Sequence, residues 1–157
     1  MYKRQFGRLP LSRASYLLIA AFLALHAVGA HYTYSETPFG AQLQSAMGLD
    51  RNHYDRLVHF CFGALMAYPF FDLALRHMRP PAPAWAYLFA FMAVLAGSGL
   101  YEIIEWLAAR VLEPEDALAF LGTQGDVFDA QKDAALALVG GLAALVLTAA
   151  LRAQRRL

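Results

Sequence analysis

Leu121-Gly-Thr-Gln-Gly-Asp-Val-Phe-Asp-Ala-Gln-Lys-Asp133 is the most informative stretch of this 157-residue chain. It holds three aspartates and a lysine, and it runs directly into an apolar segment long enough to cross a bilayer. Charged side chains on a membrane helix must bind a ligand, face a polar neighbour or cap the helix, because exposing them to lipid is costly. The stretch therefore predicts a membrane helix with a polar site at its start.

The composition of the chain is that of a membrane protein. Hydrophobic residues make up 59% and charged residues 16% of the sequence, and the mean hydropathy is +0.41. These values are too apolar for an ordinary soluble domain. The net charge of +1 gives no indication of nucleic-acid binding, and the single cysteine, Cys61, cannot form an intrachain disulfide.

Four apolar segments are each near the ~20 residues that a bilayer-crossing helix needs. We predict an all-α fold, a polytopic four-helix transmembrane bundle that forms one integral-membrane domain over residues 1–157. The helices are expected at approximately 14–32, 54–76, 84–109 and 128–151. The first segment follows basic residues and ends in Val28-Gly-Ala30, which resembles a signal-peptidase site. We favour a retained signal-anchor helix over a cleaved signal peptide.

Lysine and arginine are divided unequally between the two ends of the predicted helices. One end has nine of the 13, namely Lys3, Arg4, Arg8, Arg13, Arg76, Arg79, Arg152, Arg155 and Arg156. The other end has Arg51, Arg56, Arg110 and Lys132. The positive-inside rule then predicts that both termini are cytoplasmic. The ends of the first and third helices and the starts of the second and fourth should lie on the periplasmic side.

Acids and histidines gather at this predicted periplasmic end. On the second and fourth helices they follow i, i+3, i+7 spacing, which places them on one face of each helix: Asn52, Asp55 and His59, and then Asp126, Asp129 and Asp133. Glu102 and Glu105, preceded by Ser98, approach from the third helix. Carboxylates facing lipid cost roughly 2.5–3.5 kcal/mol each, so we expect the bundle to bring these groups together.

Two structural interpretations compete with a functional one. Acids in a first helical turn stabilise the helix by ~0.3–1 kcal/mol, and capping would account for the polar residues that open the second and fourth helices. Capping does not account for Glu102 and Glu105, which lie late in a helix. Alternatively, Arg56, Lys132 and the histidines neutralise the acids in a structural ion-pair network.

The functional interpretation is a metal or acid–base site, because so many carboxylates cannot all remain ionised without cations. Divalent metals take oxygen ligands, and imidazole shifts the preference towards zinc, manganese or iron. The expected cofactor is therefore a divalent metal (Zn, Mn, Fe or Mg). The predicted metal ligands are His59, Glu102, Glu105, Asp129 and Asp133. Asp55 or His53 is the acid–base candidate, with Tyr101 as a hydrogen-bond partner.

Further residues give expectations about packing. His31-Tyr-Thr-Tyr34, Trp85 and Trp106 suit the aromatic belts at the two membrane surfaces. Gly97-Ser-Gly99 and Gly140-Gly141 are small-residue patches where another helix can approach closely. His26 is predicted to be a buried, hydrogen-bonded histidine, and Asp72 and Arg76 should pair four residues apart.

Three motifs resemble one known family. They are Arg51-Asn-His-Tyr-Asp-Arg-Leu-Val-His-Phe60, Tyr101-Glu-Ile-Ile-Glu-Trp106 and the stretch 121–133. With His31-Tyr-Thr-Tyr34 they are similar to the YjdF-like bacterial inner-membrane proteins, over roughly residues 25 to 145. That family is a domain of unknown function, so the resemblance implies a multi-pass protein of the bacterial inner membrane and no particular reaction.

These observations lead to two hypotheses about function. The first is a metal-dependent membrane enzyme, a hydrolase or transferase acting on a lipid-like or envelope substrate. The alternative is a non-enzymatic membrane protein whose polar cluster is a structural network or docks a partner. Transport is less favoured, because the cytoplasmic half offers few polar residues beyond Asp72 and Arg76. The expected partners are the lipid bilayer, a lipid-like small molecule and further copies of the chain in a homo-oligomer.

Overall fold

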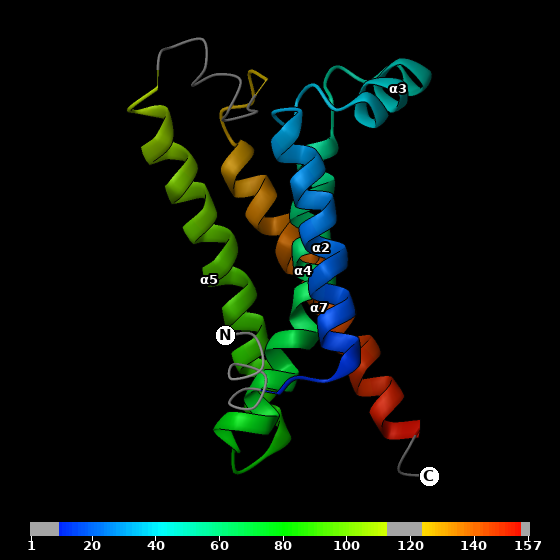
Figure 1. The fold of residues 1–157 in the computed structure, drawn as a ribbon, viewed down its shortest axis with the longest axis vertical. Coiled ribbons are helices and arrows are strands. Elements are labelled where there is room, and N and C mark those ends of the chain that lie inside the picture. The colour runs from blue at the N-terminus through cyan, green and yellow to red at the C-terminus, as the bar shows by residue number, and fades with distance from the viewer. Residues whose placement is uncertain (1–9, 113–123, 155–157) are drawn as a thin grey trace.

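The computed structural model describes residues 10–112 and 124–154, and its regular elements in these ranges are all helical. They are α2 (Arg13–His31), α3 (Pro38–Met47), α4 (Tyr54–Leu73), the π-helix η1 (Ala74–Met78), α5 (Pro83–Ala109) and α7 (Asp129–Gln154) (Figure 1). The predicted all-α class is confirmed. Several residues used above lie outside the described ranges: Lys3, Arg4, Arg8, Arg155, Arg156 and positions 121–123 of the opening stretch.

In the part of the chain that the structure describes, four helices are long and apolar enough to cross a membrane, as predicted. These spans are Arg13–His31, Tyr54–Met78, Pro83–Ala109 and Asp129–Gln154. α2 ends, α4 begins, α5 ends and α7 begins at one end of the bundle, which we call the polar end (Figure 1). The cytoplasmic location of the termini, and hence the side of the membrane on which the polar end lies, stays a prediction.

At the opposite end of the bundle, hydrogen bonds to the Asp72 carboxylate join α2 and α4. Its Oδ2 accepts hydrogen bonds from the Ser12 N–H at 2.7 Å and the Ser15 hydroxyl at 2.9 Å. Its Oδ1 accepts one from Arg76 Nε at 2.6 Å, so the predicted pair between these two residues is confirmed. Because Ser12 also caps α2, this carboxylate ties the start of α2 to the far end of α4.

α4 lies at the centre of the bundle, packed against α2, α5 and α7. Its contact with α7 is a close backbone approach. A Cβ added to Gly63 would lie 1.8 Å from the Ala137 carbonyl oxygen, and one added to Gly140 would lie 2.2 Å from the Phe60 carbonyl oxygen. The close packing predicted for Gly140 is therefore confirmed, and Gly63 is its counterpart on α4.

The other small-residue patch, on α5, has a different environment. A Cβ on Gly97 would meet the ring of Phe62 at 2.7 Å, and one on Gly99 would meet nothing within 4 Å. No helix backbone approaches closely at either glycine, so that prediction is wrong for this part of α5. α5 instead packs along α4 and α7 and diverges from α2 towards the polar end (Figure 1).

Candidate metal centre

The start of α4 is set by Asn52, which lies before the helix. Its side-chain Oδ1 accepts a hydrogen bond from the Tyr54 N–H at 3.0 Å. Its backbone N–H and carbonyl both bond the side-chain amide of Gln124, each at 2.9 Å. The predicted face shared by Asn52, Asp55 and His59 is therefore wrong for Asn52, whereas Asp55 lies in the first turn of α4 as expected. Asp55 is only 3% exposed and lies in the bundle interior.

The start of α7 follows a related pattern. Asp126 precedes the helix, accepts a hydrogen bond from the Phe128 N–H at 3.1 Å, and its carbonyl accepts one from the Asp129 N–H at 3.2 Å. The Asp126 carboxylate therefore closes a turn just before α7. The shared helix face is reduced to Asp129 and Asp133, since α7 begins at Asp129.

Arg51, Arg56, Asp126, Asp129 and Lys132 form an ion-pair network at the polar end, which we call the rim cluster. Arg51 contacts both oxygens of Asp129, at 2.5 and 3.3 Å. Arg56 contacts Asp126 at 2.5 Å and Asp129 at 3.3 Å. The hydrogen bond from Lys132, together with that from the Phe128 N–H, lowers the pKa of Asp126 to about 2. Asp129, predicted as a metal ligand, is thus engaged by two arginines.

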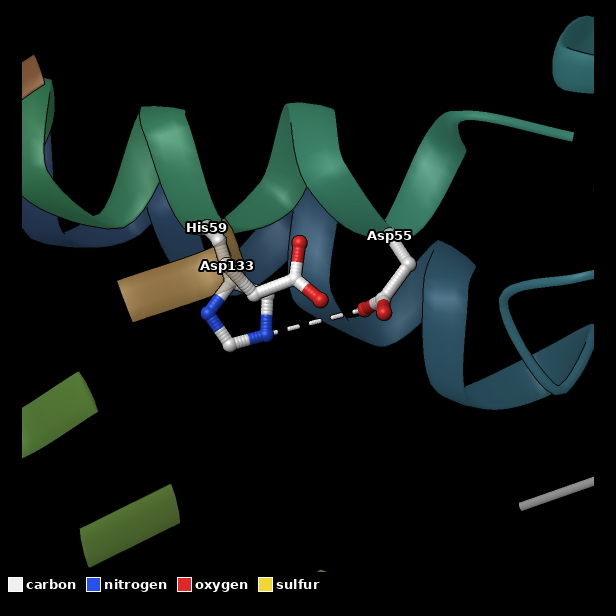
Figure 2. Close-up of side chains that lie close together, drawn as sticks. All are labelled: Asp55, His59 and Asp133. Atoms are coloured by element: carbon white, nitrogen blue, oxygen red, sulfur yellow. Dashed lines mark ion pairs between the residues drawn. The ribbon is translucent and has the colours of Figure 1, made fainter. Parts of the chain in front are cut away.

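A second group lies deeper, where α4 and α7 meet. One ligand atom each from Asp55, His59 and Asp133 lies within 4.8 Å of the others, and all three residues are buried (Figure 2). His59 Nε2 is 3.7 Å from Asp55 Oδ1. Gly63 and Ala137 follow His59 and Asp133 by one turn on their helices, so the close backbone contact between them brings these two side chains together.

Glu102 and Ser98 bring α5 into this inner site. Glu102 Oε1 lies 3.4 Å from His59 Nε2, and the Ser98 hydroxyl lies 3.4 Å from His59 Nδ1. A polar neighbour on Nδ1 fixes the orientation of an imidazole whose other nitrogen faces carboxylates. The arrangement is that of a histidine ligand with its outer hydrogen bond in place.

Three carboxylate oxygens of the inner site have no hydrogen-bond partner among residues 10–112 and 124–154. They are Asp55 Oδ1, Glu102 Oε1 and Asp133 Oδ1, and all three atoms are buried. In the described part of the chain, the ion pairs of lysine and arginine go to Asp72, Asp126 and Asp129 instead. A buried carboxylate without a partner is costly, so this group requires a cation or bound protons.

The remaining predicted site residues lie around this group. Glu105 is 4% exposed on α5 but is not among the three residues with mutually close ligand atoms. His53 immediately precedes α4, with its Nδ1 3.4 Å from Arg56 Nη1. Its pKa is lowered, chiefly by burial and then by the charges of Arg56 and Arg51. His31 is exposed at the end of α2 and packs against Tyr32.

Tyr34 was expected at the membrane surface, and that expectation is wrong. It is 4% exposed, and its hydroxyl hydrogen-bonds both His26 Nδ1 and the Tyr101 hydroxyl at 2.9 Å. Burial raises the pKa of Tyr34 to about 12, which keeps the hydroxyl protonated. His26 is hydrogen-bonded as predicted, although only half-buried. Trp85 and Trp106 are exposed at opposite ends of α5, as belt residues would be.

Comparison with known proteins supports the membrane assignment. Residues 2–154 match the family described as "Predicted membrane protein (DUF2238)". The chain is 37% identical over 142 residues to the inner membrane protein YjdF of Escherichia coli (strain K12). The aligned region covers 90% of this chain and 68% of that protein. No solved structure matches the chain significantly. With the four apolar spans, these matches confirm the predicted YjdF-like character and the multi-pass inner-membrane location.

Proposed function

We propose, for a chain that belongs to the DUF2238 family of predicted membrane proteins, that the inner site binds a divalent metal ion. Asp55, His59 and Asp133 are the proposed ligands, with Glu102 as a fourth donor. The protein would use the metal as a hydrolase or transferase on a lipid-like substrate. Asp55, predicted as an acid–base residue, is here proposed as a metal ligand. Asp129, predicted as a ligand, is instead assigned to the ion pairs of the rim cluster.

One observation carries the proposal. Three buried carboxylate oxygens, from three different helices, have no hydrogen-bond partner among the described residues. Asp55 Oδ1 and Glu102 Oε1 lie 3.7 and 3.4 Å from His59 Nε2, and Asp133 offers an oxygen within 4.8 Å of ligand atoms of Asp55 and His59. Charge repulsion alone would push such carboxylates apart, whereas a divalent cation would satisfy all of them at once. Three oxygens and one imidazole nitrogen suit manganese, iron or zinc better than magnesium, which prefers an all-oxygen shell.

A metal in this position supports a defined class of chemistry. A bound divalent ion polarises a carbonyl or phosphoryl oxygen and lowers the pKa of a bound water. In the proposed hydrolysis, the water oxygen bonds to the ester carbon or phosphorus and the bond to the leaving oxygen breaks. The leaving oxygen then takes the proton that the water gives up. In a transferase reaction, a hydroxyl group of a second substrate replaces the water.

Metal analysis of the purified protein tests this proposal. We expect about one ion of Zn, Mn or Fe per chain, and a lower thermal midpoint in chelator, because a ligand that binds only the folded state stabilises it. Asp133→Asn should weaken binding by more than ~100-fold, since even outer-shell changes cost ~10–100-fold. Asp126→Asn is the matched control, because it removes the same charge from the rim cluster and should leave affinity unchanged. Equal affinities in the two variants, or no bound metal, would refute the proposal.

The structural alternative applies to the rim cluster, where each acid has a cationic partner. Breaking a buried ion pair by removing one partner costs ~3–5 kcal/mol. Asp129→Asn should therefore lower thermal stability while metal affinity stays near that of the unmodified protein. Loss of metal in Asp129→Asn at unchanged stability would instead restore Asp129 as a ligand.

A further inference from the structure

A cavity lies beside the inner site, enclosed by α2, α4 and α5. Its volume is about 200 Å³, and most of its wall is apolar, formed by side chains such as Phe22, Leu23, Val58 and Phe62. His26, Tyr34 and Tyr101 add a polar margin, and His59, Gly97 and Ser98 complete the lining. His59 therefore belongs both to this cavity and to the proposed metal site.

The cavity lies between two helices, α2 and α5, that do not pack closely on each other. α2 packs on α4, and α5 packs on α4 and α7, but within the described residues α2 and α5 share no extensive contact. Leu23, which lines the cavity from α2, is 54% exposed. Because Leu23 is exposed and α2 and α5 share no extensive contact among the described residues, an apolar ligand dissolved in the membrane can enter sideways between these helices.

The size of the cavity narrows the class of ligand. A cavity of about 150 Å³ lined by Leu, Ile and Phe stays dry and admits a ligand such as benzene. A cavity of about 200 Å³ therefore suits a short stretch of one hydrocarbon chain. Each methylene transferred from water gains about 0.8 kcal/mol, although a chain that already lies in lipid gains mainly through packing contacts.

We propose that this cavity binds one hydrocarbon chain of a membrane lipid and thereby presents the ester or phosphoester of that lipid to the inner site. The inference rests on the proposed metal-dependent function and adds the substrate class and its route of entry. The hydroxyl of Tyr101 and the ring of His26, at the polar margin, contact the linkage between chain and head group. Gly97 of α5 lines the cavity and Gly99 does not. A larger side chain at Gly97 therefore fills the cavity without changing a polar residue, and the same change at Gly99 is its control.

The test uses the full chain in lipid nanodiscs and a fatty acid with a photoactivatable diazirine on its chain. Labelled residues are mapped by peptide mass spectrometry. We expect labelling within the α2 and α5 segments that line the cavity. Gly97→Leu fills the cavity next to Phe62 and should reduce this labelling about tenfold or more. Gly99→Leu is the control, since its side chain meets open space.

A second pair of variants covers the case in which Gly97→Leu does not fold. Leu23→Trp blocks the mouth of the cavity, and Leu17→Trp adds the same bulk to an exposed position of α2 outside the cavity. Loss of labelling in the cavity variants alone, with metal affinity unchanged, supports the proposal. Labelling that neither cavity variant reduces overturns it. If the cavity variants lose labelling and the unmodified protein binds no metal, the proposed metal-dependent function is refuted while the binding site for a hydrocarbon chain is supported.

Discussion

Gly63→Ala should change the geometry of the inner site indirectly, because the added Cβ would meet the backbone of α7. The added Cβ would lie 1.8 Å from the Ala137 carbonyl oxygen, 2.6 Å from the Gly141 nitrogen and 2.8 Å from the Ala137 carbonyl carbon. All three are backbone atoms of α7, so no side chain can rotate to make room. Ordinary contact begins at 3.4 Å, and α4 and α7 must therefore separate.

The size of the effect follows from this separation. Raising the closest contact from 1.8 Å to 3.4 Å moves His59 and Asp133, one turn away, by an amount far beyond the roughly ±0.2 Å tolerance of a metal–ligand distance. A misplacement of about 1 Å can cost ~100-fold in function. We therefore expect metal affinity to fall about 100-fold, and the free energy of unfolding to fall by ~1–3 kcal/mol through overpacking.

The assay is a calorimetric titration of the detergent-solubilised protein with Zn²⁺, together with thermal unfolding followed by circular dichroism. Gly99→Ala serves as the matched control, because its Cβ meets nothing within 4 Å, and it should behave like the unmodified protein. If Gly63→Ala bound Zn²⁺ with unchanged affinity and unfolded at an unchanged temperature, the close α4–α7 contact could not be what positions the site.

Three further predictions concern other parts of the chain. Tyr34→Phe should lower the free energy of unfolding by about 1–3 kcal/mol, since it removes hydrogen bonds to two half-buried partners, His26 and Tyr101, whereas Tyr32→Phe, on an exposed ring, should not. Because the pKa of His53 is lowered in the folded protein, the unfolded chain takes up the proton first, and stability should be lost as pH falls below 6.5. His53→Gln should make the thermal midpoint depend less steeply on pH between about pH 8 and pH 5. An unchanged dependence would show that His53 is not its cause. In a cysteine-free variant, an impermeant maleimide added outside spheroplasts should label Val127→Cys and not Met78→Cys, both at exposed positions, whereas the reverse pattern would invert the predicted topology.

Much of the fold follows from the sequence, because a bilayer imposes strong rules on length and composition. A run of about 20 apolar residues has few alternatives to a membrane helix, and the charged residues at its ends mark where it stops. The Asp72–Arg76 pair followed from helical spacing alone, since its residues are four apart on the continuous span Tyr54–Met78. The contact between Gly63 and Ala137 did not, because it depends on how two helices are rotated against each other.

Because the rotation of the helices against each other does not follow from the sequence, some site residues could not be assigned from it. Spacing places Asp133 and His59 on particular faces of their helices, but it does not say which first-turn acid points inward. Asp55 and Asp129 occupy equivalent positions in sequence, and the ion pairs that Arg51 and Arg56 make with Asp129 separate them. Tyr34 was missed because the chain turns back through two left-handed residues, Thr33 at φ 50° and Tyr34 at φ 56°. No periodicity signals such a turn.

X-ray absorption at the zinc edge of Zn²⁺-loaded protein tests the central claim most directly, because it reports the atoms bound to the ion. The account predicts nitrogen and oxygen ligands at about 2.0–2.2 Å with the scattering pattern of one imidazole, and loss of that imidazole in His59→Gln. A sulfur shell at about 2.3 Å, which would implicate Cys61, or a spectrum that His59→Gln leaves unchanged, would contradict a metal site built from Asp55, His59 and Asp133.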